Sequence, residues 1–167
     1  MSATGHLSIT IRNRQRTRRI NTGLFRIIIA TALEETGVTQ CELCFHLVDG
    51  DEMSLINQQY LQHTGSTDVI TFDHVESRPV NLNSTTCLYG EIFICADEAA
   101  SQSKQFGTTW QAELVRYAVH GILHLLGHDD LHPTARRTMK REENRLVRLL
   151  AATQTFNALA VARLKTG

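Results

Sequence analysis

An apolar helix at residues 110–126 is the feature that most restricts what this chain can fold into. The segment reads WQAELVRYAVHGILHLL, and its apolar side chains are too many for one exposed stripe. Gly127 follows at once, and glycine readily adopts the left-handed conformation that closes a helix tightly. We therefore expect the helix to end at Gly127.

The remaining segments alternate between strand-like and helix-like patterns, which predicts an α+β fold. No repeat or linker divides the 167 residues, so we expect residues 1–167 to form a single domain. The expected architecture is a small four-stranded sheet packed by about five helices. Gly90 interrupts one expected strand and suggests a β-bulge there. The strands are expected at residues 6–12, 40–48, 69–72 and 87–95, a polar loop at residues 74–86, and the other helices at residues 21–36, 51–62, 97–105 and 133–152.

Two histidines on the apolar helix have the spacing of a metal site. His120 and His124 are four residues apart, which places their Cβ atoms on one helix face, about 5–6 Å from each other. Beyond Gly127 the chain can turn back under the helix, where Asp129 and Asp130 are placed to offer a carboxylate. Two imidazoles and one carboxylate leave a coordination position open, as catalytic zinc sites do. The alternative is a helix end that simply carries polar residues.

The third ligand can be chosen from three residues. His128 lies directly after the glycine turn, and His132 precedes Pro133 and resembles a helix entry. Asp130 stands ten residues after His120, the spacing at which metzincin-type sites place their third ligand. We therefore predict Asp130 as the third ligand, and participation of His128 or His132 stays open.

The position after His120 argues against a peptidase. In H-E-x-x-H peptidases a Glu at this position is the general base, whereas here it is Gly121. A bound metal would still lower the pKa of its water to about 7. Glu113, seven residues before His120, is a candidate catalytic residue, a partner that orients an imidazole, or a surface acid. Glu91 is a weaker candidate, and Asp68 is expected to turn the chain before the third strand.

The neutral net charge conceals an uneven distribution. Residues 1–26 carry six arginines and no acid, residues 27–130 carry fifteen acids and three basic residues, and residues 131–167 carry eight basic residues and two acids. Basic chain ends can bind a polyanion such as RNA, although an exposed arginine-rich stretch is also compatible with a solvated loop. The candidate RNA-binding residues of the first segment are Arg14, Arg16, Arg18 and Arg19.

The cysteines and the chain start favour a reducing compartment. Cys41 and Cys44 form a C-x-x-C in a strand-like segment, where residues three apart point to opposite faces. We interpret them as ordinary buried thiols instead of a redox pair or half of a zinc site. The sequence has no export signal and no apolar run long enough for a membrane span, so we expect a cytoplasmic protein without membrane contact.

The histidine segment and two others resemble the YbeY family of metal-dependent endoribonucleases. Residues 120–130, HGILHLLGHDD, are similar to the family signature H-G-x-L-H-L-x-G-Y-D-H. Residues 57–72 contain N-x-x-Y and T-D-V-I-T-F, similar to the family's N-x-x-Y-R and T-D-V-L-S-F, and residues 89–92, YGEI, resemble its L-G-D-I strand. Glu113 also occupies the position of a usual family acid. The matches follow the family order over about residues 40–145.

The resemblance implies a metzincin-like core, in which a mixed sheet of four strands packs against helices and the metal lies on a central helix. It also implies one Zn²⁺ per chain held by His120, His124 and Asp130. It implies a single-strand-selective endoribonuclease that hydrolyses RNA phosphodiesters at the 3′ end of small-subunit ribosomal RNA and in ribosome quality control. The implied partners are single-stranded and ribosomal RNA, the small ribosomal subunit and its proteins, with no peptide substrate, in the cytoplasm.

Two departures from the family pattern keep alternatives open. Asp130 replaces the third family histidine, and Leu61 replaces an arginine that would brace a scissile phosphate. One alternative is a non-catalytic ribosome-assembly factor with a structural metal. The other is a zinc hydrolase that acts on peptides or small amides.

Overall fold

The fold is described from a computed structural model, which describes residues 5–62, 65, 67–74 and 87–162. Most of the polar loop expected at residues 74–86 therefore lies outside the described residues. The described residues form four strands and five α-helices, which confirms the α+β class and the predicted order of elements. In chain order they are β1 (His6–Asn13), α1 (Thr22–Glu35), β2 (Gln40–Val48), α2 (Gly50–Leu61), β3 (Val69–Asp73), β4 (Cys87–Cys95), α3 (Ala96–Phe106), α4 (Trp110–Leu125) and α5 (Pro133–Thr153), followed by a 3₁₀ turn at Phe156–Leu159.

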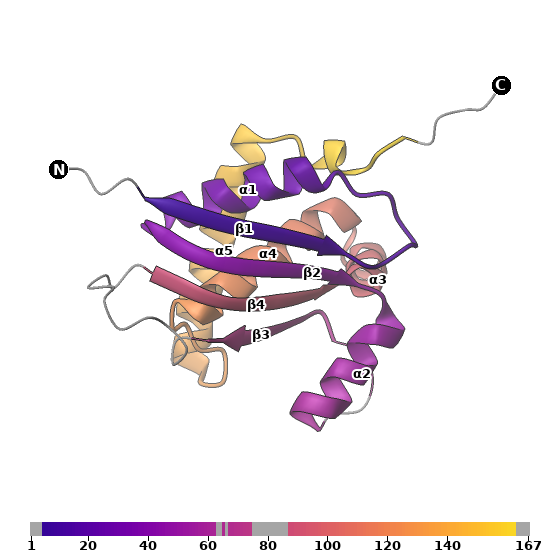
Figure 1. The fold of residues 1–167 in the computed structure, drawn as a ribbon, viewed down its shortest axis with the longest axis horizontal. Coiled ribbons are helices and arrows are strands. Elements are labelled where there is room, and N and C mark those ends of the chain that lie inside the picture. The colour runs from indigo at the N-terminus through magenta and orange to yellow at the C-terminus, as the bar shows by residue number, and fades with distance from the viewer. Residues whose placement is uncertain (1–4, 63–64, 66, 75–86, 163–167) are drawn as a thin grey trace.

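The four strands form one mixed sheet in the order β1-β2-β4-β3. β1 and β4 both run parallel to β2, whereas β3 pairs antiparallel with β4 and forms one edge (Figure 1). The mixed four-stranded sheet is thus as predicted. The antiparallel strand lies at the edge nearest to the end of α4, since α4 contacts both β3 and β4.

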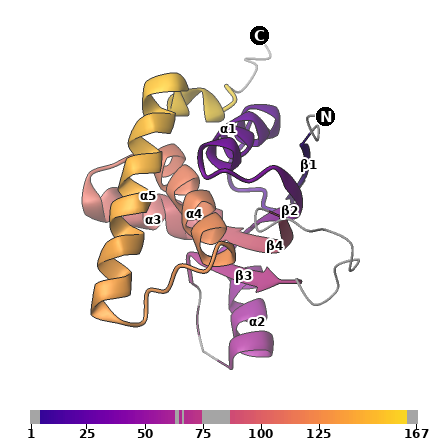
Figure 2. The same ribbon diagram turned by 90° about the vertical axis from the view of Figure 1, so that its left-hand side faces the viewer.

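Four helices cover one face of the sheet. α1, α3, α4 and α5 all lie on the same side, and α4 contacts α1, α3 and α5 as well as the strands (Figure 2). This arrangement confirms that the apolar helix is central. In the described ranges, no helix combines the length and the apolar character that crossing a membrane requires. The largest fully buried side chains between the two layers include Phe25, Phe45, Leu114 and Ile122.

The described residues cover the opposite face of the sheet only in part. α2 packs Met53 and Ile56 against Ile70, which makes a second, smaller apolar cluster at one corner of this face. The rest of the face belongs to β1, β2 and the middle of β4, and it points toward the viewer in Figure 1, in front of the helix layer. We call this part, which none of the described helices covers, the open face.

Hydrogen bonds to the backbone fix both ends of α4. The Thr109 side chain accepts a hydrogen bond from the Ala112 N–H at 3.1 Å and caps the first turn. At the other end Gly127 has φ of 98°, and the His128 N–H donates to the Leu123 carbonyl at 3.0 Å. The helix therefore ends where the sequence predicts, and the chain is turned back beneath its last turn.

Two glycines allow close packing around β4. The prediction of a bulge at Gly90 is wrong, because β4 keeps an unbroken register with both β2 and β3. A Cβ at Gly90 would instead lie 2.5 Å from the Phe72 carbonyl oxygen. A Cβ at Gly121 would lie 2.8 Å from Ile92 Cγ2, so this helix position faces the sheet. The absence of a peptidase-type Glu at position 121 thus has a steric reason.

Candidate metal centre

The side chains of His120, His124 and Asp130 converge at the end of α4. The two Nε2 atoms are 3.0 Å apart, and Asp130 Oδ2 lies 3.6 Å from that of His120 and 3.5 Å from that of His124. In a tetrahedral zinc site with bonds near 2.0–2.1 Å, neighbouring N and O ligand atoms are about 3.3 Å apart. The three atoms therefore already form a triangle of the size that one tetrahedral ion requires, and we call these residues the trio.

The glycine turn and the loop after it place the carboxylate. After Gly127, Asp129 accepts a hydrogen bond from the Leu131 N–H at 2.7 Å, which forms an Asx-type turn. The Arg136 Nε–H donates to the Asp130 carbonyl at 2.8 Å and ties the loop to α5. These bonds hold Asp130 beneath the helix and opposite the two imidazoles.

Hydrogen bonds at Nδ1 orient both imidazoles. The His124 Nδ1–H donates to the His128 carbonyl at 3.2 Å, and the His120 Nδ1–H points at Glu143 Oε2, 3.4 Å away. With a proton at each Nδ1, both Nε2 atoms offer lone pairs to the centre of the trio. Two lone pairs that face each other at 3.0 Å require a proton or a metal cation between them.

Glu143 on α5 is a buried acid beside His120 that was not predicted from the sequence. Its carboxylate is 4% exposed and accepts a hydrogen bond from Arg116 at 3.0 Å, beside its contact with His120. The signal was present, because Met139, Glu143, Leu146 and Leu150 have a heptad-like spacing and are all buried. An acid within such an apolar stripe needs a buried partner, which here is the imidazole.

The pKa values of this pair reflect the same contact. Burial raises the pKa of Glu143. Hydrogen bonds from His120 and Arg116 and the charge of Lys140 together lower it by more than burial raises it, so the net pKa lies below its ordinary value. Burial lowers the pKa of His120, but the hydrogen bond and charge of Glu143 outweigh it, so the net pKa is raised. The centre therefore favours a positive charge at His120 or beside it.

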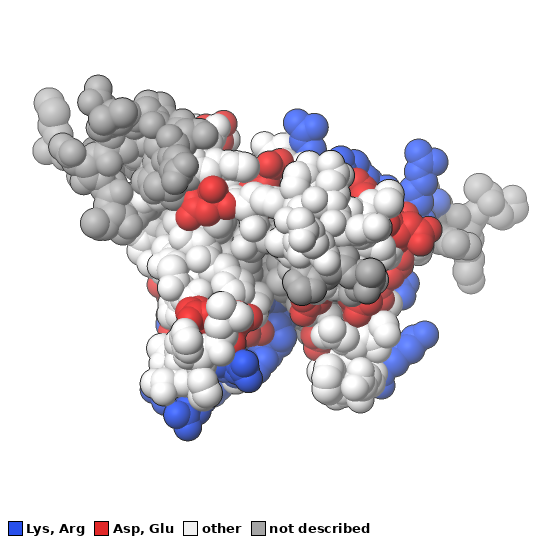
Figure 3. Space-filling model, turned by 90° about the horizontal axis from the view of Figure 1, so that it is seen from below, with Lys and Arg blue, Asp and Glu red and all other residues white. Residues whose placement is uncertain are grey.

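The trio lies between two hollows at the β3 edge of the molecule. The larger, about 530 Å³, is lined by Arg116, Arg136 and Lys140 together with Glu113 and Glu143, and we call it the groove. The smaller, about 340 Å³, is bounded by Leu61 and the start of β3. Both are also lined by Asp68, His120 and Asp130. Figure 3 shows this edge of the molecule, where the surface is hollowed between two lobes and acidic and basic side chains lie close together.

The two acids considered as catalytic candidates have different surroundings. Glu113 is 6% exposed, lines the groove, and accepts a hydrogen bond from the Thr108 hydroxyl at 2.7 Å. Glu91 points to the open face and contacts His46 and His74, on the far side of the sheet from the trio. The Asp68 carboxylate accepts from the Val69 N–H at 2.8 Å, as its expected turning role requires.

The two remaining histidines of the segment stand apart from the trio. The His132 side chain is 81% exposed, and its Nε2 lies 3.9 Å from Asp129. His128 contributes its backbone carbonyl to the orientation of His124. In the part of the chain that the structure describes, the group of metal-capable side chains at this place consists of His120, His124 and Asp130.

The arginine-rich stretch lies away from the described lining of both hollows. Arg14 forms an ion pair with Glu52 at 2.8 Å, and its guanidinium lies 5.9 Å from the ring centre of Phe93. Arg18 lies 5.5 Å from the ring centre of Trp110, at the start of α4. Arg16 and Arg19 are exposed. The basic residues that do line the groove come from α4 and α5.

Comparisons with known proteins give one consistent family. The family model described as "Endoribonuclease YbeY" matches residues 8–151. Curated proteins named "Endoribonuclease YbeY" include one from Salinibacter ruber, 32% identical over 81% of this chain and 87% of that protein, and one from Elusimicrobium minutum, 35% identical over 75% and 86%. The solution structure of TM1509 from Thermotoga maritima has a TM-score of 0.64 and 23% identity over 95% of this chain and 99% of that one, which supports the same fold.

Proposed function

We propose, from the premise that this chain belongs to the Endoribonuclease YbeY family, that it is a zinc-dependent endoribonuclease that hydrolyses phosphodiester bonds of single-stranded RNA. One observation carries the metal dependence. The Nε2 atoms of His120 and His124 and the Oδ2 atom of Asp130 lie 3.0–3.6 Å from one another and face a common point. This point opens to two hollows, so a polymer could pass across it.

His120, His124 and Asp130 would hold the ion, and their donor types fit zinc. When bound, the ion supplies Lewis-acid polarisation of a phosphate oxygen and of water. The protein orients these ligands through Glu143 and the His128 carbonyl, which keep the Nε2 lone pairs directed inward.

The groove supplies the charge that an RNA backbone requires. Arg136 and Lys140 line it from α5, and Arg116 lines it from α4, where its charge is shared with Glu143 and Asn144. We assign Arg136 and Lys140 to phosphate contacts, because Arg116 already donates to Glu143 and Asn144. Glu113 is the proposed proton acceptor, because its carboxylate lies in the same groove. The arginines at positions 14, 16, 18 and 19 remain a proposed outer RNA contact.

Family membership supports a finer proposal about the substrate. The RNA would be the 3′ end of small-subunit ribosomal RNA, acted on in maturation and quality control, with the small ribosomal subunit and its proteins as partners. The proposed compartment is the cytoplasm, where thiols stay reduced, and Cys41 and Cys44 are free thiols.

A non-catalytic assembly factor is the second candidate, favoured by one residue. Leu61 is 45% exposed and lines the smaller hollow, where it presents an apolar side chain in place of the family arginine. In cells that depend on this protein, His124→Ala separates the two candidates. An enzyme loses ribosomal RNA processing in this variant, whereas an assembly factor that retains its fold keeps it.

The proposed activity is tested with the purified, zinc-loaded protein. Single-stranded RNA with the sequence of the small-subunit 3′ end, the same RNA as a duplex, and a peptide pool are incubated with it. We expect cleavage of the single strand only, loss of cleavage with a chelator, and recovery when zinc is added back. Cleavage that persists in the chelated, metal-free protein would contradict the proposal.

A further inference from the structure

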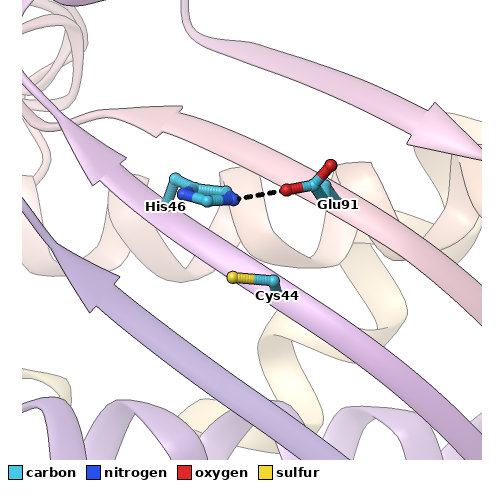
Figure 4. Close-up of side chains that lie close together, drawn as sticks. All are labelled: Cys44, His46 and Glu91. Carbon is cyan, nitrogen blue, oxygen red and sulfur yellow. Dashed lines mark hydrogen bonds and ion pairs between the residues drawn. The ribbon is translucent and has the colours of Figure 1, made fainter.

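A second group of metal-capable side chains lies on the open face of the sheet. Cys44 and His46 are two residues apart on β2, and Glu91 on β4 pairs directly with Cys44 in the parallel register. Their neighbours Leu43, Phe45 and Ile92 are buried under the helix layer. Because side chains alternate along a strand, Cys44, His46 and Glu91 point to the opposite face. Figure 4 shows the three side chains close together on adjacent strands. We call them the open-face cluster.

The ligand atoms of this cluster are near enough for one ion. One atom from each of the three residues lies within 4.8 Å of the other two, and His46 Nε2 is 2.9 Å from Glu91 Oε1. Tetrahedral zinc with N, O and S ligands needs separations of about 3.3–3.7 Å. A shift of about 1 Å by one side chain closes that difference. The half-exposed Glu91 has room for it, since its side chain is 38% exposed.

Two contacts hold the cluster in place before any ion binds. The His46 ring stacks on Phe93 with centres 4.2 Å apart and planes 6° apart, and its side chain is only 8% exposed. The second oxygen of Glu91 lies 2.9 Å from His74 Nε2. Carboxylate ligands of metal sites are themselves held by hydrogen bonds, and His74 supplies such a contact here.

We propose that Cys44, His46 and Glu91 form a second metal site, which takes a thiophilic divalent ion such as zinc independently of the trio. A thiolate, an imidazole and a carboxylate are all zinc ligands, and a water would complete four coordinates. Binding releases the thiol proton of Cys44 to solvent, moves the imidazole proton of His46 from Nε2 to Nδ1, and replaces the hydrogen bond from His46 Nε2 to Glu91 by two bonds to the ion.

The surroundings of the cluster allow this binding. A hollow of about 350 Å³ reaches Cys44, Glu91 and His74 from solvent. Arg12 lines the same hollow and lies beside the thiol of Cys44. The positive charge of Arg14 also favours the thiolate form of Cys44. One thiolate and one carboxylate neutralise a divalent ion, so the bound site carries no net charge for these arginines to repel.

The consequence for the fold is a bridge between neighbouring strands. An ion held by β2 and β4 crosslinks them on the open face, and binding to the folded state alone stabilises that state. The trio lies on the helix side at the β3 edge, so this site adds no ligand to the proposed reaction centre.

Cobalt(II) distinguishes the two sites, because the trio contains no sulfur. The full, metal-free chain is titrated with cobalt in a non-thiol reductant, and thiolate-to-cobalt charge-transfer absorption in the near ultraviolet is recorded. We expect one equivalent of absorbing cobalt in the wild type and in His120→Ala. The band should disappear in Cys44→Ser and persist in Cys41→Ala, whose thiol lies on the opposite face of the same strand.

Glu91→Gln provides a second, milder variant if Cys44→Ser fails to fold, as judged by circular dichroism. It should weaken cobalt binding at the absorbing site at least about tenfold, because a carboxylate ligand is lost. A wild type without the charge-transfer band overturns the proposal. So does a band that survives in folded Cys44→Ser, or one that keeps full affinity in Glu91→Gln.

Discussion

The trio and the open-face cluster contain similar residue types in very different settings. The trio combines nitrogen and oxygen donors at the end of a central helix, with Glu143 and a backbone carbonyl behind the imidazoles and a basic groove beside them. The open-face cluster adds a thiol and lies on two adjacent strands. The hollow beside it is about 350 Å³, smaller than the groove of about 530 Å³. Donor geometry alone therefore does not define a reaction centre. The proposed reaction centre differs from the open-face cluster in the larger groove beside it and in the basic residues of α4 and α5 that line this groove.

The largest expected difference between the two groups is seen when one ligand is removed from each. His124→Ala should reduce cleavage of single-stranded RNA more than about 100-fold, since losing a ligand costs more than losing an outer partner. Cys44→Ser should leave the cleavage rate unchanged. Cleavage rates are measured at saturating zinc with both variants shown to be folded, and they show which of the two groups RNA cleavage depends on. Equal loss in both variants would mean that the two groups act together.

Removing the buried support of His120 should have the next largest effect. Glu143→Gln should weaken zinc binding about 10–100-fold, because the imidazole loses a charged partner that fixes its orientation. The affinity is measured by competition with a chromophoric chelator. Glu142→Gln is the matched control, because its carboxylate pairs with Arg145 on the outer side of α5. A similar loss in the control would show that Glu143 has no special role.

The groove and the arginine-rich stretch can be compared by their effect on RNA affinity. Removing the side-chain charges of Arg136 and Lys140 should weaken the salt dependence of RNA binding. The magnitude of the negative slope of log affinity against log salt should fall by about 1.4, or about 0.7 for each phosphate contact with a single strand. Charge reversal of Arg16 and Arg18 should have a smaller effect, because neither lines the groove. Unchanged affinity and slope after the charge reversal would remove the arginine-rich stretch from the RNA interface.

The smallest expected effect is a pH dependence of stability in the zinc-free protein. Although burial lowers the pKa of His120, Glu143 raises it above 6.5, so its contribution is full below pH 6.5 and is lost as the pH rises through the folded value. The pKa of Glu143 lies below 4.5, so its contribution is present above pH 4.5 and is lost as the pH falls through the folded value.

Thermal unfolding of the zinc-free protein across this range tests the pair. The contribution of the pair to Tm should be greatest between pH 4.5 and pH 6.5. Glu143→Gln should flatten the profile in that window. An unaltered profile in the variant would show that the contact does not stabilise the folded state.

The residues of the trio could be found from the sequence because they are local. Helix periodicity brings His120 and His124 to one face, and the glycine turn brings Asp130 back to them. Which side of α4 faces the sheet was not predictable, so the steric reason for Gly121 required the structure. The same holds for Gly90. A glycine within a strand suggests a bulge, but the structure shows that this glycine allows close packing against the Phe72 carbonyl.

The open-face cluster escaped prediction for the opposite reason. Its ligands lie on strands that are far apart in the chain and meet only through the register that pairs Cys44 with Glu91. Alternation correctly separated Cys41 from Cys44, but it did not show what Cys44 would meet on its own face. Cys44 was therefore interpreted as an ordinary thiol. Non-local pairing of strands is the information that the sequence pattern lacks.

The most direct measurement is the zinc content of the purified chain in a Cys44→Ser background, where the open-face cluster lacks its thiol. After loading with zinc and desalting, the Cys44→Ser protein should retain one zinc per chain and cleave single-stranded RNA. Adding His120→Ala to this background should remove the zinc and abolish cleavage while the fold is kept. A folded double variant that still holds one zinc per chain would contradict the assignment of the metal centre to His120, His124 and Asp130.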